Sequence, residues 1–110
     1  MKILICITLI FATFTVSAGK TSSSKIKQLY VNGSWVMAEV DITMLNGNNF
    51  PEQCASSSWV AITPSEPGYE IITSTLMLAY AANKSVSFYV TGCSGQNKSS
   101  KRITSIWVND

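Results

Sequence analysis

The stretch WVAITPSEPGYEIITSTLMLAYAA, residues Trp59–Ala82, carries a strand, a turn and a helix in direct succession. The apolar run Ser58–Thr63 predicts a strand, and Pro64–Gly68 predicts a turn because it is rich in Pro and Gly. We then expect an amphipathic helix from Ser65 to about Ala82, closing near Asn83. Its predicted features are a Ser65 N-cap, Pro67 in the first turn, and an apolar stripe made of Tyr69, Ile72, Leu76 and Ala79.

Two apolar runs precede this unit and two follow it. Ile26–Val31 and Trp35–Ile42 come first and are separated by Asn32-Gly33. This dipeptide is the strongest short hairpin signal, because both residues tolerate the positive φ of a type I′ turn. Ser87–Thr91 and Ile103–Val108 follow the helix and predict the last two strands.

The predicted element order is therefore β-β-β-α-β-β in a small α+β, mainly β domain. Five strands with one helix between the third and the fourth is the order of the oligonucleotide/oligosaccharide-binding (OB) barrel. A split α+β sheet of another topology is the alternative. Gly19–Ser24 is polar and predicts a flexible segment, and Leu45–Pro51 predicts a loop.

The N-terminus has the three-part pattern of a secretory signal peptide. Lys2 precedes the apolar run Ile3–Ala12, and Val16-Ser17-Ala18 places small residues before the predicted cleavage site at Gly19. We therefore expect residues 1–18 to be a signal peptide and residues 19–110 to be a single OB-like domain. The protein would be secreted or periplasmic.

Cleavage after Ala18 would remove Cys6 and leave only Cys54 and Cys93. In an oxidising compartment such a pair predicts a disulfide. The chain has no histidine, so two cysteines could complete a zinc site only with carboxylates, which is rare for structural zinc. Closing a loop of about 40 residues should contribute on the order of 4 kcal/mol to stability.

Charge and composition exclude several classes of protein. Eight Lys/Arg and six Asp/Glu residues give a net charge of +2, which is no electrostatic footprint for nucleic acid. We expect no nucleic-acid partner, no membrane insertion, no metal and no cofactor. The basic cluster Lys98, Lys101 and Arg102 is interpreted as a solvated loop.

The sequence contains few of the residues that enzymes use for catalysis. Without histidine there is no Ser-His-Asp or Cys-His machinery. Glu39 and Asp41 lie two apart on a predicted strand and could form a glycosidase pair, but wet-face carboxylates are usually only solvated. We expect that the protein is not an enzyme, with a hydrolase using this pair as a distant third interpretation.

Aromatic residues are the candidate binding groups. Trp35 and Tyr89 fall opposite the apolar alternation of their own strands, so we expect exposed rings that could stack on sugars or anchor a protein partner. Trp59 and Trp107 are expected in the core or at subunit contacts.

Several segments together resemble a group of small exported gammaproteobacterial proteins, most without an assigned role: Phe50–Cys54, Trp59–Thr63, Ser74–Val86 and Gly92-Cys93. More distantly, the size, signal peptide, single disulfide and closing strand Ile103–Asn109 resemble the B subunits of AB5 enterotoxins. Those subunits are OB-folds that assemble into pentameric rings and bind host glycans. No glycan-contact residue is carried over, because this chain has no N-terminal helix with the first cysteine.

These observations predict a non-enzymatic exported binding module for a glycan or a protein, like an AB5 toxin B subunit, with a homo-oligomer as one form it could take. The alternative is a periplasmic or surface protein that interacts with another protein, such as an inhibitor.

Overall fold

The hairpin predicted at Asn32-Gly33 is present in the computed structural model, which describes residues 18–45 and 54–109. Strands β3 (Gln28–Val31) and β4 (Val36–Glu39) pair antiparallel on its two sides. The turn is not type I′, because neither Asn32 nor Gly33 has a positive φ. Instead, Asn32 Oδ1 accepts hydrogen bonds from the N–H groups of Ser34 (2.7 Å) and Trp35 (3.0 Å), so a side chain closes the loop.

The central strand, turn and helix are also confirmed, with a different helix start. Strand β5 (Trp59–Ile62) is followed by helix α2 (Tyr69–Ala81), whose N-cap is Gly68 with φ 78° and not the predicted Ser65. Thr63 and Glu66 form a separate turn: the Glu66 N–H donates to the Thr63 carbonyl at 3.0 Å. The Thr63 N–H in turn donates to Glu66 Oε1 at 2.7 Å, and this second bond keeps Ser65 outside the helix.

Helix α2 ends in a Schellman motif. Asn83 adopts φ 56°, and its N–H donates to the Tyr80 carbonyl at 3.2 Å while the Lys84 N–H donates to the Ala79 carbonyl at 2.9 Å. These are the two bonds that define the motif, and asparagine is one of the few residues that tolerates the left-handed position. The predicted end near Asn83 is confirmed.

The prediction that Gly19–Ser24 is a flexible segment is wrong. Strands β1 (Ala18–Lys20) and β2 (Ser24–Lys25) both pair antiparallel with β6 (Ser85–Ser94). Thr21 lies buried between them, where its N–H donates to the Phe88 carbonyl at 2.7 Å and its Oγ1 accepts from the Phe88 N–H at 2.9 Å. The pairing comes from β6, so the polar sequence of the segment does not reveal it.

The sheet contains seven strands, in the order β1-β6-β7-β5-β4-β3, with β2 also on β6. All neighbours are antiparallel except β5 and β7 (Ser100–Asn109), which run parallel. The sheet does not close, so the five-stranded barrel is not confirmed and the predicted strand number is too low. Two short helices complete the described chain, α1 (Ile42–Leu45) and the 3₁₀ helix η1 (Gln96–Lys98). The first of these replaces the end of the strand predicted over Trp35–Ile42.

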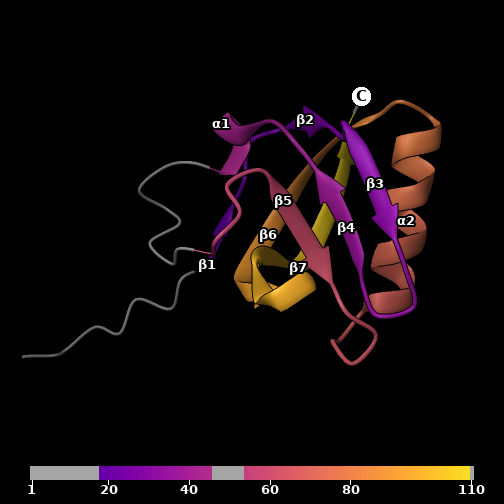
Figure 1. Cartoon of the computed structure of the whole chain (residues 1–110). Helices are drawn as coiled ribbons and strands as arrows, with labels where there is room; N and C mark the ends of the chain where they lie inside the picture. Colours follow the sequence, from indigo (N-terminus) through magenta and orange to yellow (C-terminus); the bar gives the residue numbers. More distant parts are fainter. Residues whose placement is uncertain (1–17, 46–53, 110) are drawn as a thin grey trace, which may run out of the picture.

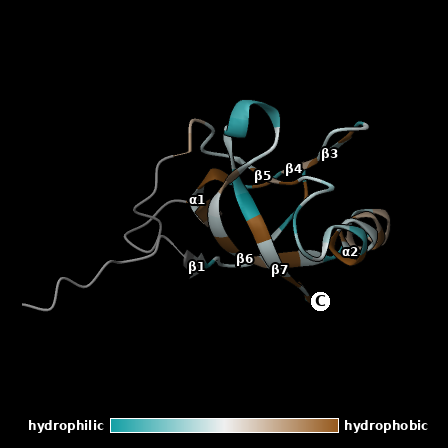
Figure 2. Ribbon diagram, turned by 90° about the horizontal axis from the view of Figure 1, so that it is seen from below, coloured by the Kyte–Doolittle hydropathy of each residue, from teal (hydrophilic) through white to brown (hydrophobic). Residues whose placement is uncertain are grey.

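The sheet bends so that β3, β4 and β5 face β6 and β7 across the core, and α2 covers one side between them (Figures 1 and 2). The predicted helix stripe is confirmed, because Ile72, Leu76 and Ala79 are the buried residues of α2. Phe88 is the largest of the fully buried side chains. Residues of both halves of the sheet meet in this core: Val36, Ala38, Val40, Val60, Ile62, Val86, Phe88, Val90 and Ile103.

The disulfide between Cys54 and Cys93 is confirmed, with the two Cα atoms 5.8 Å apart. It ties the segment that leads into β5 to the end of β6. Residues 1–17 of the predicted signal peptide and residues 46–51 of the predicted loop lie outside the described residues. None of the helices within the described ranges is long and apolar enough to cross a membrane.

Candidate ligand-binding cleft

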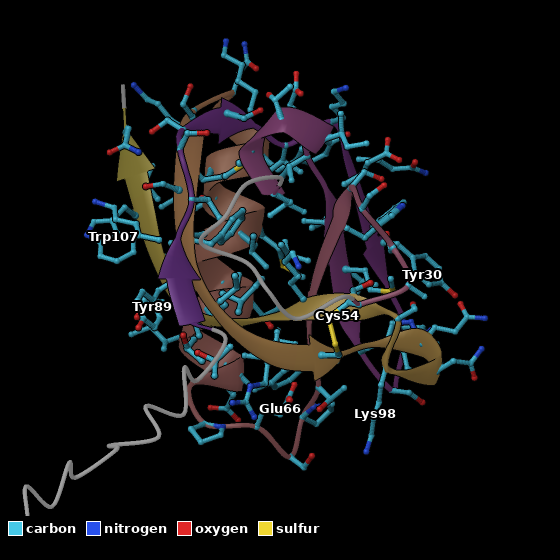
Figure 3. All side chains as sticks on the ribbon, turned by 90° about the vertical axis from the view of Figure 1, so that its left-hand side faces the viewer. Tyr30, Cys54, Glu66, Tyr89, Lys98 and Trp107 are labelled. Carbon is cyan, nitrogen blue, oxygen red and sulfur yellow. A yellow bond between two sulfur atoms is a disulfide. The ribbon has the colours of Figure 1, made fainter. Side chains whose placement is uncertain are left out.

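Trp35 lies at one wall of an open cleft of about 540 Å³. The β3–β4 loop, the β5–α2 turn, the end of β6 with the loop that follows it, and β7 all contribute to it. Glu66 and Lys98 mark this end of the molecule in Figure 3. The described residues that line the cleft are Ser34, Trp35, Thr63, Ser65, Glu66, Cys93, Ser94, Gly95, Lys98 and Arg102.

The floor of the cleft is organised by Glu66. Its Oε1 accepts hydrogen bonds from the Thr63 N–H (2.7 Å) and from Ser94 Oγ (2.6 Å), and its Oε2 lies 3.8 Å from Arg102 Nη1. One carboxylate therefore holds the β5–α2 turn, the end of β6 and β7 together. The Glu66 side chain is only 16 % exposed, and its Oε2 accepts no hydrogen bond among the described residues.

Two donors of the cleft residues have no acceptor. Trp35 Nε1 and Arg102 Nε are buried and make no hydrogen bond among the described residues. Buried N–H groups without an acceptor cost free energy. Both residues belong to the lining of the cleft. Trp35 was expected to be exposed, but it is half-buried.

The loop that carries Lys98 is fixed to the sheet by Gly95. Gly95 has φ 77°, and a Cβ at this position would lie 2.8 Å from Ala61 Cβ and 3.4 Å from Met37 Sδ. Its backbone thus packs against the face of β4 and β5 that points away from the core. This close approach positions one wall of the cleft and requires glycine.

Tyr89 lies elsewhere, on the outer face of β1, β6 and β7. It pairs with Lys20 on one side and Ser105 on the other, and Trp107 is its diagonal neighbour on the same face. Lys20 Nζ lies 4.4 Å from the centre of the Trp107 ring, a cation–π distance. Figure 3 shows Tyr89 and Trp107 on the same side of the molecule, and we call Lys20, Tyr89 and Trp107 the outer aromatic face.

The structure therefore separates the two predicted binding residues, since β5 and β7 lie between β4 and β6. Trp107 is 40 % exposed, so the expected place in the core is wrong and the alternative of a subunit contact stays a prediction, while Trp59 is half-buried at the start of β5. The sequence of β7 does not indicate which of its faces is buried, because both faces carry apolar residues.

Glu39 and Asp41 do not share a strand. Strand β4 ends at Glu39, and Asp41 Oδ1 accepts hydrogen bonds from the Thr43 N–H (3.0 Å) and Oγ1 (2.8 Å) at the start of α1. The backbone hydrogen bond from Thr43 is the main cause of a lowered pKa of Asp41. The two hydrogen bonds from Thr43 make Asp41 a cap of α1, and its lowered pKa is opposite to the raised pKa that a glycosidase acid needs.

The position of Glu66 in the sequence predicts only the first turn of a helix, so its hydrogen bonds in the cleft could not be predicted. Lys98 and Arg102 lie in a basic cluster of the sequence, which does not indicate their common site with Trp35. No protein-family model, curated protein or solved structure matches this chain.

Proposed function

We propose that this chain is a non-enzymatic exported module that binds a carbohydrate in the cleft at Trp35. The observation that carries the proposal is that the half-buried Trp35, whose Nε1 has no acceptor among the described residues, lines one cleft with the Glu66–Arg102 pair. Sugars present apolar faces and hydroxyl groups, and aromatic rings with a few fixed polar groups recognise both.

The place of the cleft in the fold also supports the proposal. Strands β3, β4, β5, β7 and β6 follow one another in the sheet, and β2, only two residues before β3, pairs with β6 at the other end. We propose that β1, β2 and β3 together form the first strand of a partly open OB-like barrel. OB-folds bind oligosaccharides and oligonucleotides at the loops between strands 1 and 2 and between strands 4 and 5.

The cleft is lined from both of these loops. Ser34 and Trp35 belong to the loop between β3 and β4, and Gly95 and Lys98 belong to the loop between β6 and β7. A nucleic-acid ligand is the weaker candidate, because the net charge of +2 offers little attraction for a phosphate backbone. The resemblance to AB5 toxin B subunits adds to the proposal that the ligand is a glycan and that the protein assembles with other subunits.

The alternative, a periplasmic or surface protein that interacts with another protein, is favoured by one observation. Helix α2 exposes Ile71 (72 %) and Leu78 (66 %), seven residues apart on one face, and Glu70 is the only charged residue among its thirteen. Surface helices usually carry charged residues on their outer face. An uncharged helix face with large apolar side chains is typical of a protein contact.

The two functions are separated by a glycan array followed by calorimetry on the best ligand. We expect Trp35→Ala to weaken binding at least tenfold, about 1.4 kcal/mol, while circular dichroism stays unchanged. Trp35→Phe keeps a ring but lacks the N–H and should lie between the two. Tyr89→Ala, on the outer aromatic face, is the matched control and should bind normally.

Glycan binding that survives Trp35→Ala but is lost in Tyr89→Ala would move the site to the outer aromatic face. No binding to any glycan of the array would contradict the carbohydrate proposal and favour the protein partner.

A further inference from the structure

We infer that the ligand of the cleft presents an oxyanion, a carboxylate or a sulfate, to Arg102 and Lys98. This inference rests on the proposed function and adds the charge of the ligand to it. It starts from the charges at the cleft, where, among the residues that the structure describes, Lys98 and Arg102 are the two cations and Glu66 is the one acidic residue in the lining.

Glu66 does not neutralise Arg102 fully. Their closest contact is 3.8 Å, which is within reach of an ion pair but too long for a hydrogen bond. The two hydrogen bonds that Glu66 accepts, from Thr63 at 2.7 Å and Ser94 at 2.6 Å, both go to Oε1 and do not involve Arg102. Among the described residues, the Arg102 guanidinium thus has a charged neighbour and no hydrogen-bond acceptor of its own.

The Arg102 side chain is 35 % exposed and so accessible from the cleft. A guanidinium is a rigid fork of donors whose geometry matches two oxygens of one carboxylate or sulfate group. Arg102 Nε is buried and makes no hydrogen bond among the described residues, so an oxyanion in the cleft would be held by the other guanidinium donors and not by Nε. A neutral hydroxyl group would leave the guanidinium charge uncompensated.

Two further donors stand around the same space. Lys98 is exposed on the opposite loop, and the indole of Trp35, whose N–H can only donate, lines the same cleft. Among the described residues, two cations and one carboxylate give the cleft lining a net charge of +1. Its complement is an acceptor-rich anionic group on a sugar.

The test compares three classes of glycan on the purified protein: neutral, carboxylated and sulfated. For the best carboxylated ligand, its methyl ester is the matched neutral probe, and for a sulfated ligand the desulfated sugar takes this place. We expect the anionic member of the pair to bind at least tenfold more tightly at low salt, and the difference to shrink as salt rises. The class that binds best identifies the oxyanion.

Arg102→Gln should remove this preference, and Lys98→Gln, on an exposed loop, should reduce it without affecting the fold. Lys25→Gln, an exposed lysine on β2, is the charge-matched control and should leave it unchanged. Trp35-dependent binding that is equal for acid and ester, and insensitive to Lys98→Gln, would overturn the oxyanion inference but keep the carbohydrate proposal. Absence of Trp35-dependent glycan binding would overturn both.

Discussion

At the scale of single residues, the three tryptophans occupy three different surroundings, although each lies in an apolar run of the sequence. Trp35 lines the cleft, Trp59 is half-buried at the start of β5, and Trp107 lies on the surface under Lys20. Their energetic weights differ accordingly. Burial decides what an aromatic ring contributes to stability, and hydropathy alone does not.

Trp107→Ala should lower the free energy of unfolding by only about 1 kcal/mol, through loss of the cation–π contact and partial packing. Phe88→Ala is the matched buried change and should cost about 3–5 kcal/mol, because Phe88 is fully buried. Urea denaturation of both variants measures the difference. A loss in Trp107→Ala as large as that in Phe88→Ala would mean that Trp107 is covered, for example by a second subunit.

At the scale of elements, the loop from Gly95 to Ser99 depends on a close contact with the sheet. Gly95→Ala would place a methyl group 2.8 Å from Ala61 Cβ in a left-handed backbone position, so we expect a loss of about 1–3 kcal/mol. Ala61 is fully buried and has little freedom to move. The same change should weaken ligand binding, because it displaces the loop that carries Lys98.

Gly33→Ala is the matched control for this loop. Its Cβ would meet nothing within 4 Å, and its φ is not positive, so we expect a change within about 0.5 kcal/mol. Thermal unfolding of the two variants, together with binding titrations, provides the comparison. Equal stability of Gly95→Ala and Gly33→Ala would show that the loop adjusts without cost.

Elements that depend on local signals could be predicted from the sequence. The stripe of Ile72, Leu76 and Ala79 and the stop at Asn83 predicted α2 well, because both follow from the geometry of one helix. The β3–β4 hairpin followed from Asn32-Gly33, although its turn is closed by a side chain. These features need no information from distant residues.

Elements that depend on distant partners could not be predicted. Strand β1 pairs with Thr91, Val90 and Tyr89, some seventy residues along the chain. The sequence of a short polar segment does not predict this pairing. The cleft is harder still, since Trp35, Glu66 and Arg102 come together only when four separate segments pack. Charge clusters in the sequence indicate candidates, but topology decides which of them meet.

At the scale of the whole molecule, the disulfide connects the two halves of the chain across a separation of 39 residues. The double variant with Cys54→Ser and Cys93→Ser should lose about 3–4 kcal/mol of unfolding free energy, because the unfolded chain has more conformational entropy when the disulfide no longer closes the loop. That is a large fraction of the 5–15 kcal/mol typical of small domains. Urea unfolding of the variant and the oxidised protein measures the loss.

The same double variant tests how the cleft is supported, since Cys93 lines it. Reduction of the native protein should reproduce the stability loss of the double variant, which separates the effect of the bond from that of the new serines. A change below about 1 kcal/mol in both experiments would contradict the contribution assigned to the disulfide.

The pairing of β1 with β6 bears on when the predicted signal peptide can be cleaved. The predicted cleavage bond, between Ala18 and Gly19, lies within β1, where both residues are paired with β6. A peptidase needs its substrate extended and unpaired, so a docked β1 hides this bond. Cleavage of the predicted signal peptide would then have to precede the pairing of β1 with β6. A precursor that folded first would keep its signal peptide.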